Sequence, residues 1–469
     1  MSLNLEKTLA WTKSLEAKTP DAPAELAMLN DLQGNILKGH GRRFTAHLFL
    51  AFDNNQSAVA RATVRAFGQE VTTALDQLTD AQVYRTTGAD GGAFISFFLT
   101  AAGYRALGVD QAMPDGQAFA AGMNSRPLED PPSAQWEPAL AADVHAMLLI
   151  GAASEPELSV VLARCKARIA ETGGALSLLG VEYGKAITND DKNNIEHFGY
   201  VDDRSQPLAL QEDVDREAEY GGIDLWNPSI PLSQLLVKCP GGQLEVSHGS
   251  YFVFRKLEQN VQGFKRREID LAEILPGAGE RAGASVVGRF ENGTPVTMSA
   301  TEIPVKAKGD AGLPNNFNYA DDPDGLKCPF VGHIRKTNPR TPETDTDDDS
   351  KIHLMARRGI PYGDQINNPE KRLDIMPTGG VGLLFMAYQS NIENQFEFTQ
   401  HMWANNSDFL NPDTGIDPII GQPAHAGSGR YPKKYGVSLS EPFNFSGYVT
   451  MRGGEYFFAP SISFLKHLH

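Results

Sequence analysis

Short apolar runs and helix-like stretches alternate along the first half of the chain. The runs His47–Phe52 and Ala93–Thr100 have the length and composition of buried strands, and the apolar spacing across Ser57–Leu78 predicts a helix between them. The same order then repeats, with predicted strands at His145–Gly151 and at about Ala175–Tyr183. The pattern therefore predicts two strand–helix–strand units in this half.

The second predicted helix has a well-marked start and end. Ser154 and Glu157 form an S-x-x-E capping box, with Pro156 in the first helical turn, and Gly173 and Gly174 end the helix. The helix places one set of apolar residues on a single face: Leu158, Val161, Leu162, Cys165 and Ile169. Cys165 is therefore predicted to be a core residue without a chemical role.

A polar, turn-rich stretch from Gln211 to Asn227 is predicted to separate the two halves. Beyond it the alternation of strands and helices resumes. The predicted elements are strands at Ser250–Arg255, Gly379–Tyr388 and Glu455–Ala459, and helices at about Leu257–Ile274 and Asn391–Trp403.

Two units of related order favour an α+β protein built from duplicated ferredoxin-like domains, with antiparallel sheets covered by helices. We place these domains at residues 1–215 and 216–469. The periodicity alone is compatible with other α+β topologies. Between Pro276 and Arg357 lies a long segment with little regular pattern, and loops of that length are often functional.

Length and charge narrow the function. At 469 residues the chain exceeds the size at which one hydrophobic core usually stops growing, so two core-forming units or one duplicated fold are expected. The formal charge of −16 argues against nucleic acid as a partner, because phosphate binding needs clustered Lys and Arg. The sequence leaves the oligomeric state open.

The cysteines and the N-terminus indicate a compartment. Cys165, Cys239 and Cys328 are widely spaced and odd in number, so they predict neither a disulfide framework nor a CxxC metal site. The first 20 residues lack the basic start and apolar core of a secretory signal, and no run approaches the roughly 20 apolar residues of a membrane span. We therefore expect a cytoplasmic, soluble protein.

Three segments contain residues that could bind a metal or take part in a reaction. His333 follows an apolar stretch and precedes Arg335, and neutral imidazole is a common iron ligand, although a lone histidine is also often a structural residue. Arg357 precedes a sharp turn, where it could stabilise negative charge or form a surface ion pair. Asp202 and Asp203 lie in a turn. A carboxylate there could accept a proton, or it could only cap the turn.

Taken together and in this order, the three segments resemble the dye-decolorizing peroxidase family. The stretches Asp31–His40 and Gly453–Ser461 resemble it as well, so the similarity covers nearly the whole chain. The chain is most similar to the longer members, the subgroup with fungal and some bacterial enzymes. The resemblance implies the dimeric α+β barrel superfold, and one haem b per chain held mainly by the C-terminal half.

The resemblance also implies roles for individual residues. His333 matches the iron ligand and Asp417 the acid that accepts a hydrogen bond from it, while Asp202 and Arg357 match the pair that activates peroxide. Arg358 fits the arginine position less well because of its spacing to Pro361.

Further residues match the surroundings of the cofactor. Leu383 and Phe385 match the apolar pair lining the peroxide side, and Arg335 is a candidate partner for a haem propionate. The sequence departs from the family motif at Asp203, where the family has glycine. Asp203 could point away from the haem, or it could crowd the pocket and repel the charge of Asp202.

The implied activity is a peroxidase that uses hydrogen peroxide to oxidise aromatic and dye reductants, through an oxyferryl intermediate. Because a carboxylate base stays ionised at lower pH than a histidine, we expect an acidic optimum. Two alternatives remain: a haem-binding or carrier protein with weak peroxidase activity, and a haem enzyme similar to chlorite dismutase.

Overall fold

The computed structural model describes residues 3–469 except 19, 203, 305–314, 341–348, 367, 369 and 423–426. Asp203 therefore lies outside the described residues. The α-helices are α1 Trp11–Leu15, α2 Ala22–Asp31, α3 Ser57–Gly68, α4 Ala74–Thr87, α5 Ala101–Ala106, α6 Gln117–Ala121, α7 Pro138–Ala141, α8 Glu155–Ala170, α9 Gln211–Tyr220, α10 Val261–Ile274, α11 Arg281–Val287, α12 His333–Thr337 and α13 Ile462–Lys466. Among the described residues, no helix is both long enough and apolar enough to cross a membrane.

One large antiparallel sheet organises the molecule. Its strands follow the order β10 (Ile360–Tyr362), β11 (Gly382–Gln389), β8 (His248–Gln259), β14 (Val449–Ala459), β2 (Phe94–Leu99), β3 (Ala146–Ala152), β1 (Phe44–Phe52) and β4 (Leu176–Lys185). Short strands β7 (Val237–Lys238) and β9 (Ala356–Arg357) pair with β8 and β11. Two hairpins lie apart from this sheet, β5 (Ile187–Thr188) with β6 (Asn194–Ile195) and β12 (Pro432–Lys434) with β13 (Ser438–Leu439). The predicted α+β class, with antiparallel strands covered by helices, is confirmed.

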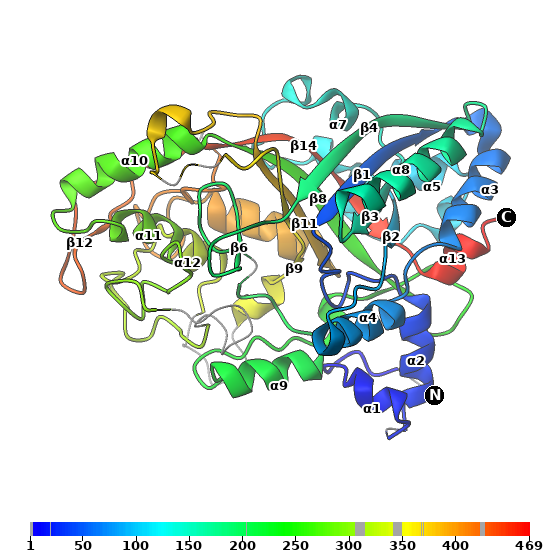
Figure 1. The fold of residues 1–469 in the computed structure, drawn as a ribbon, viewed down its shortest axis with the longest axis horizontal. Helices are drawn as coiled ribbons and strands as arrows, with labels where there is room; N and C mark the ends of the chain where they lie inside the picture. Colours follow the sequence, from blue (N-terminus) through cyan, green and yellow to red (C-terminus); the bar gives the residue numbers. More distant parts are fainter. Residues whose placement is uncertain are drawn as a thin grey trace.

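The two predicted sheets form one continuous sheet. Strands β1 to β4 of the first half and β8, β11 and β14 of the second half meet where Phe458 of β14 pairs with Leu99 of β2. Figure 1 shows α10, α11 and α12 gathered at the left of the molecule, and α3 and α13 at the right. The boundary at 215/216 stays a prediction, and both residues lie inside α9.

Both faces of strands β1, β2 and β3 are buried, which explains the continuous apolar runs in the sequence. On β1, Leu48 and Leu50 belong to one core cluster, whereas Phe49 between them belongs to a second cluster on the opposite face. The first cluster includes Cys165 from α8, which is 1% exposed, so the predicted core role of this cysteine is confirmed.

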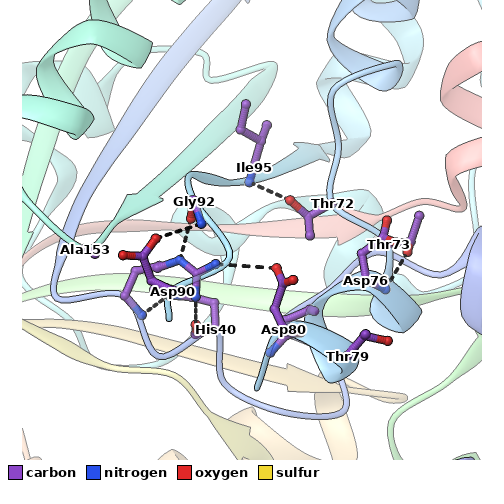
Figure 2. Close-up of polar contacts among 12 residues, drawn as sticks. His40, Thr72, Thr73, Asp76, Thr79, Asp80, Asp90, Gly92, Ile95 and Ala153 are labelled. Carbon is purple, nitrogen blue, oxygen red and sulfur yellow. Dashed lines mark hydrogen bonds and ion pairs between the residues drawn. The ribbon is translucent and has the colours of Figure 1, made fainter. Parts of the chain in front are cut away.

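The predicted helix Ser57–Leu78 is wrong in its continuity, because the chain forms two helices, α3 and α4. The connecting residues are held by hydrogen bonds to other elements. Figure 2 shows the Thr72 hydroxyl accepting from the Ile95 N–H, and the Thr73 hydroxyl accepting from the Asp76 N–H at the start of α4. The Thr73 contact caps α4 and the Thr72 contact ties the connection to β2, so a separate helix begins after α3 has ended at Gly68.

Other predicted boundaries also moved. The prediction of a turn-rich stretch at Gln211–Asn227 is wrong over its first part, because α9 forms there. Only Val214 of this helix is buried, so the sequence carries little apolar periodicity that could have indicated a helix. The predicted helix at Leu257–Ile274 starts later, because β8 continues to Gln259 and Asn260 caps α10. The predicted helix Asn391–Trp403 is wound as π-helix over Glu393–Glu397 and Thr399–Ala404.

Candidate active site

A cavity of about 260 Å³ brings together residues that are far apart in the sequence. His333, Asp202, Arg357, Leu383 and Phe385 all line it. The cavity lies against the sheet face that carries the first core cluster, since Phe385 and Leu257 pack against that cluster. Five of the seven residues predicted for the site therefore share one cavity.

His333 begins α12, and one of its ring nitrogens is already engaged. Its Nδ1 lies 2.8 Å from Oδ2 of Asp417, whose side chain is fully buried. The other oxygen of Asp417 accepts from the backbone N–H groups of Ile419 and Ile420, at 2.8 and 2.9 Å. This carboxylate accepts the Nδ1 proton, so the lone pair of Nε2 is available to a metal in the cavity.

The charge state of Asp417 supports this arrangement. Burial on its own raises the pKa of the Asp417 carboxyl, but the adjacent His333 and the two backbone N–H groups outweigh burial and hold the pKa below its usual value. An ionised carboxylate behind the imidazole strengthens the histidine as a metal ligand.

Asp202 is carried by a tightly held turn. Glu196 accepts hydrogen bonds from the N–H groups of Phe198 (2.7 Å) and Tyr200 (3.0 Å), across a left-handed Gly199 with φ of 98°. The Asp202 N–H donates to the carbonyl of Asn194 at 3.0 Å. The backbone of this turn therefore directs Asp202 to the cavity by local hydrogen bonds.

Arg357 is tied to the segment that follows Asp202. It lies on β9, its Nη2 donates to the carbonyl of Arg204 at 2.6 Å, and its backbone N–H donates to the side chain of Gln206 at 3.0 Å. Arg358 instead donates to the carbonyl of Asn35 at 2.8 Å and does not line the cavity. The structure thus places Arg357, and not its neighbour, at the cavity.

Leu383 and Phe385 form an apolar wall from alternate positions of β11. They pair across the ladder with Leu257 and Arg255 of β8, which line the same cavity. Side chains two residues apart on a strand point to the same face, so both residues can reach the cavity.

Three arginines that the sequence analysis missed form a cationic end of the cavity. Arg204, Arg289 and Arg340 line it, and the guanidinium groups of Arg289 and Arg340 both donate to the hydroxyl of Ser205, at 3.0 and 2.9 Å. Burial, together with the charges of Arg340 and Arg204, lowers the pKa of Arg289 to about 9. Arg289 and Arg340 are buried, whereas Arg204 is half-buried and also forms an ion pair with Glu217 at 3.8 Å. Two buried guanidinium groups beside a third favour an anionic ligand.

Arg335 lies elsewhere. Its guanidinium is buried against Asp322, with Nη1 2.9 Å from Oδ2, and also donates to the carbonyl of Cys328 at 2.6 Å. Arg335 is not among the cavity-lining residues, so we leave it out of the proposed cofactor contacts. Arg335 has the positive charge that a propionate partner needs, but its side chain pairs with Asp322 and does not reach the cavity.

The cavity has the features that a haem requires. Among the described residues, Nε2 of His333 has no hydrogen-bond partner. Leu383 and Phe385 give the cavity an apolar wall, and arginines gather where two carboxylates of a haem could bind. No local pattern marked Arg204 and Arg289 in the sequence. Arg340 ends the basic stretch that follows His333, but nothing in that stretch singled it out.

The chain is similar to known proteins over its whole length. Residues 227–415 match the model of the C-terminal part of Dyp-type peroxidases. The chain is 41% identical to the multifunctional dye peroxidase DyP2 of Amycolatopsis sp., over the full length of both chains. It is 30% identical to the dye-decolorizing peroxidase msp1 of Mycetinis scorodonius, covering 93% of this chain and 87% of that one.

A solved structure gives the same result. The DyP-type peroxidase of Anabaena sp. superposes with a TM-score of 0.88 at 41% sequence identity, covering 96% of each chain.

Proposed function

Since the chain belongs to the dye-decolorizing peroxidase family and is therefore a haem-dependent peroxidase that acts on dyes, we propose how its own residues divide the work. His333 holds the haem iron, Asp202 and Arg357 activate hydrogen peroxide, and Leu383 and Phe385 keep the peroxide side apolar. The convergence of these residues on one cavity supports this assignment. Full-length relatives that are named peroxidases favour it over the haem-carrier and chlorite-dismutase alternatives.

Arg289 and Arg340, with Arg204 beside them, are proposed to bind the haem propionates. All three line the cavity. Burial and the charges of Arg340 and Arg204 lower the pKa of Arg289. A haem propionate at this end of the cavity would accept charge-assisted hydrogen bonds from these guanidinium groups. Bidentate arginine contacts to carboxylates are among the stronger hydrogen bonds in proteins.

The bound haem supplies a redox iron, at which peroxide is reduced and organic donors are oxidised. The carboxylate of Asp202 accepts one proton of hydrogen peroxide and returns it to the oxygen that leaves as water. The guanidinium of Arg357 stabilises the negative charge on that departing oxygen. On the other side, Asp417 holds the Nδ1 proton of His333 and so keeps Nε2 free of a proton.

The proton-transfer role can be tested by Asp202→Asn, which keeps the shape of the side chain and removes the base. We expect the rate of reaction with hydrogen peroxide to fall by about 10²- to 10⁴-fold, measured by stopped-flow absorbance, with haem content unchanged. Asp191→Asn, at an exposed position, is the matched control and should retain the wild-type rate. A rate loss below about threefold for Asp202→Asn would remove this residue from the proposed base role.

The ligand role can be tested by His333→Gly with added imidazole. We expect the variant to lose the Soret spectrum of a histidine-bound haem and to regain it when imidazole enters the space left by the side chain. A variant that keeps the wild-type spectrum without imidazole would show that another residue holds the iron.

We also propose the cytoplasm as the location of this protein. All three cysteines are buried and free. Free cysteines are typical of reducing compartments.

A further inference from the structure

Lys336 is a fully buried lysine on α12, one helical turn beyond His333. Its ammonium donates to two backbone carbonyls, those of Asn406 at 2.7 Å and Gly415 at 2.6 Å. In the described part of the chain, no carboxylate lies within ion-pair distance of this ammonium. Burying an ammonium without an ion pair is costly, so its retention here requires an explanation beyond packing.

The two carbonyls bracket the loop that leads to Asp417. Asn406 and Gly415 are the two ends of this loop, and Asp417 follows only two residues later. Backbone bonds close the same loop, from Gly415 N–H to the carbonyl of Ser407 at 2.9 Å and from Asp417 N–H to the carbonyl of Ala404 at 2.8 Å. Lys336 therefore connects the helix of His333 directly to the segment that supplies its hydrogen-bond partner.

The surrounding charges agree with this connection. Burial lowers the pKa of Lys336 to about 8, and the carboxylates of Asp417 and Asp408 act in the opposite direction. The ring of Phe409, within the same loop, lies 5.9 Å from the ammonium. The lysine is thus held by the loop through carbonyls, an aromatic ring and two nearby negative charges.

We propose that Lys336 is a positioning residue for the proximal histidine: by holding both ends of the 406–415 loop, it keeps the Asp417 carboxylate on Nδ1 of His333. This role extends the proposed function, because it rests on His333 as the haem ligand. Loss of the tether lets Asp417 withdraw from Nδ1, and His333 then becomes a weaker electron donor.

The test measures the bond between His333 and the haem iron, and not only catalysis. In the haem-loaded Lys336→Met variant, we expect the iron–histidine stretching frequency of the ferrous protein to fall and the haem reduction potential to rise. Both shifts should run in the direction produced by Asp417→Asn. In the double variant the effects should be smaller than the sum of the single effects, because both changes act on the same hydrogen bond.

Lys433→Met, at an exposed position on β12, is the matched control and should leave both quantities at their wild-type values. Lys336→Gln keeps a donor for one carbonyl and should give an intermediate shift; it also serves if Lys336→Met does not fold. Unchanged quantities in Lys336→Met, shifts opposite to those of Asp417→Asn, or additive effects in the double variant would each overturn the proposal. Failure of His333 as ligand would appear separately, as a wild-type Soret spectrum in His333→Gly.

Discussion

Glu196 shows how one side chain can link the stability of the fold to pH. It lines the cavity and accepts from two backbone N–H groups of the turn that carries Asp202, and from the amide of Gln259 at 2.5 Å. Burial raises the pKa of the Glu196 carboxyl to about 7, although these hydrogen bonds oppose the shift. The folded protein therefore holds this proton more tightly than the unfolded chain does.

This raised pKa predicts a pH-dependent stability. The contribution of Glu196 is fully present below about pH 4.5 and is lost as the pH rises through about 7. The free energy of unfolding of Glu196→Gln minus that of the wild type should therefore increase by about 1–3 kcal/mol when the pH rises from 5 to 8. Urea denaturation at several pH values measures this difference. Glu219→Gln, at an exposed position, should show no such trend, and a flat difference for Glu196→Gln would contradict the prediction.

At the level of elements, the local signals that were strong in the sequence formed as predicted. Ser154 caps α8, with its hydroxyl accepting from the N–H of Glu157. The return contact differs by one residue from the usual capping box, because Glu157 accepts from the N–H of Ala153 at 3.2 Å. By contrast, α9 offered only one buried apolar residue, Val214, and was not recognised.

The α8 cap leads to a prediction about stability. Ser154→Ala removes the acceptor of an N–H at the helix start and should lower the free energy of unfolding by about 1 kcal/mol. Ser154→Asp keeps an acceptor there and should remain within about 0.5 kcal/mol of wild type. Thermal or urea denaturation of the three proteins checks both values. Equal losses in the two variants would show that the cap itself does not stabilise α8.

At the scale of the whole molecule, segments from both halves of the chain line the cavity. Asp202 and Arg204 precede the middle of the chain, whereas Arg289, His333 and Arg340 follow it. The cationic end therefore forms only after the two halves meet, and we expect haem binding to stabilise their association.

This arrangement predicts how the haem is recognised. Arg289→Leu should weaken haem binding by about 10- to 100-fold, because it removes a charged partner of a propionate. The same variant should bind haem dimethyl ester, which lacks the negative charges, about as well as wild type does. Spectroscopic titration of the haem-free proteins with both compounds checks this. Equal losses for haem and for the ester would indicate a change in cavity shape instead of a lost charge contact.

The sequence by itself determined the α+β class, the buried strands, the capped α8 and the segment around His333. The first three depend on neighbouring residues, whose periodicity and spacing are visible along the chain, whereas the segment around His333 was marked by its resemblance to a family. Tertiary structure alone decided the junction of β14 with β2, the division of α3 from α4, the three cavity arginines and the surroundings of Lys336. These features depend on contacts between distant segments. Apolar patterning reports that a residue is buried, but it does not identify the partner against which the residue is buried.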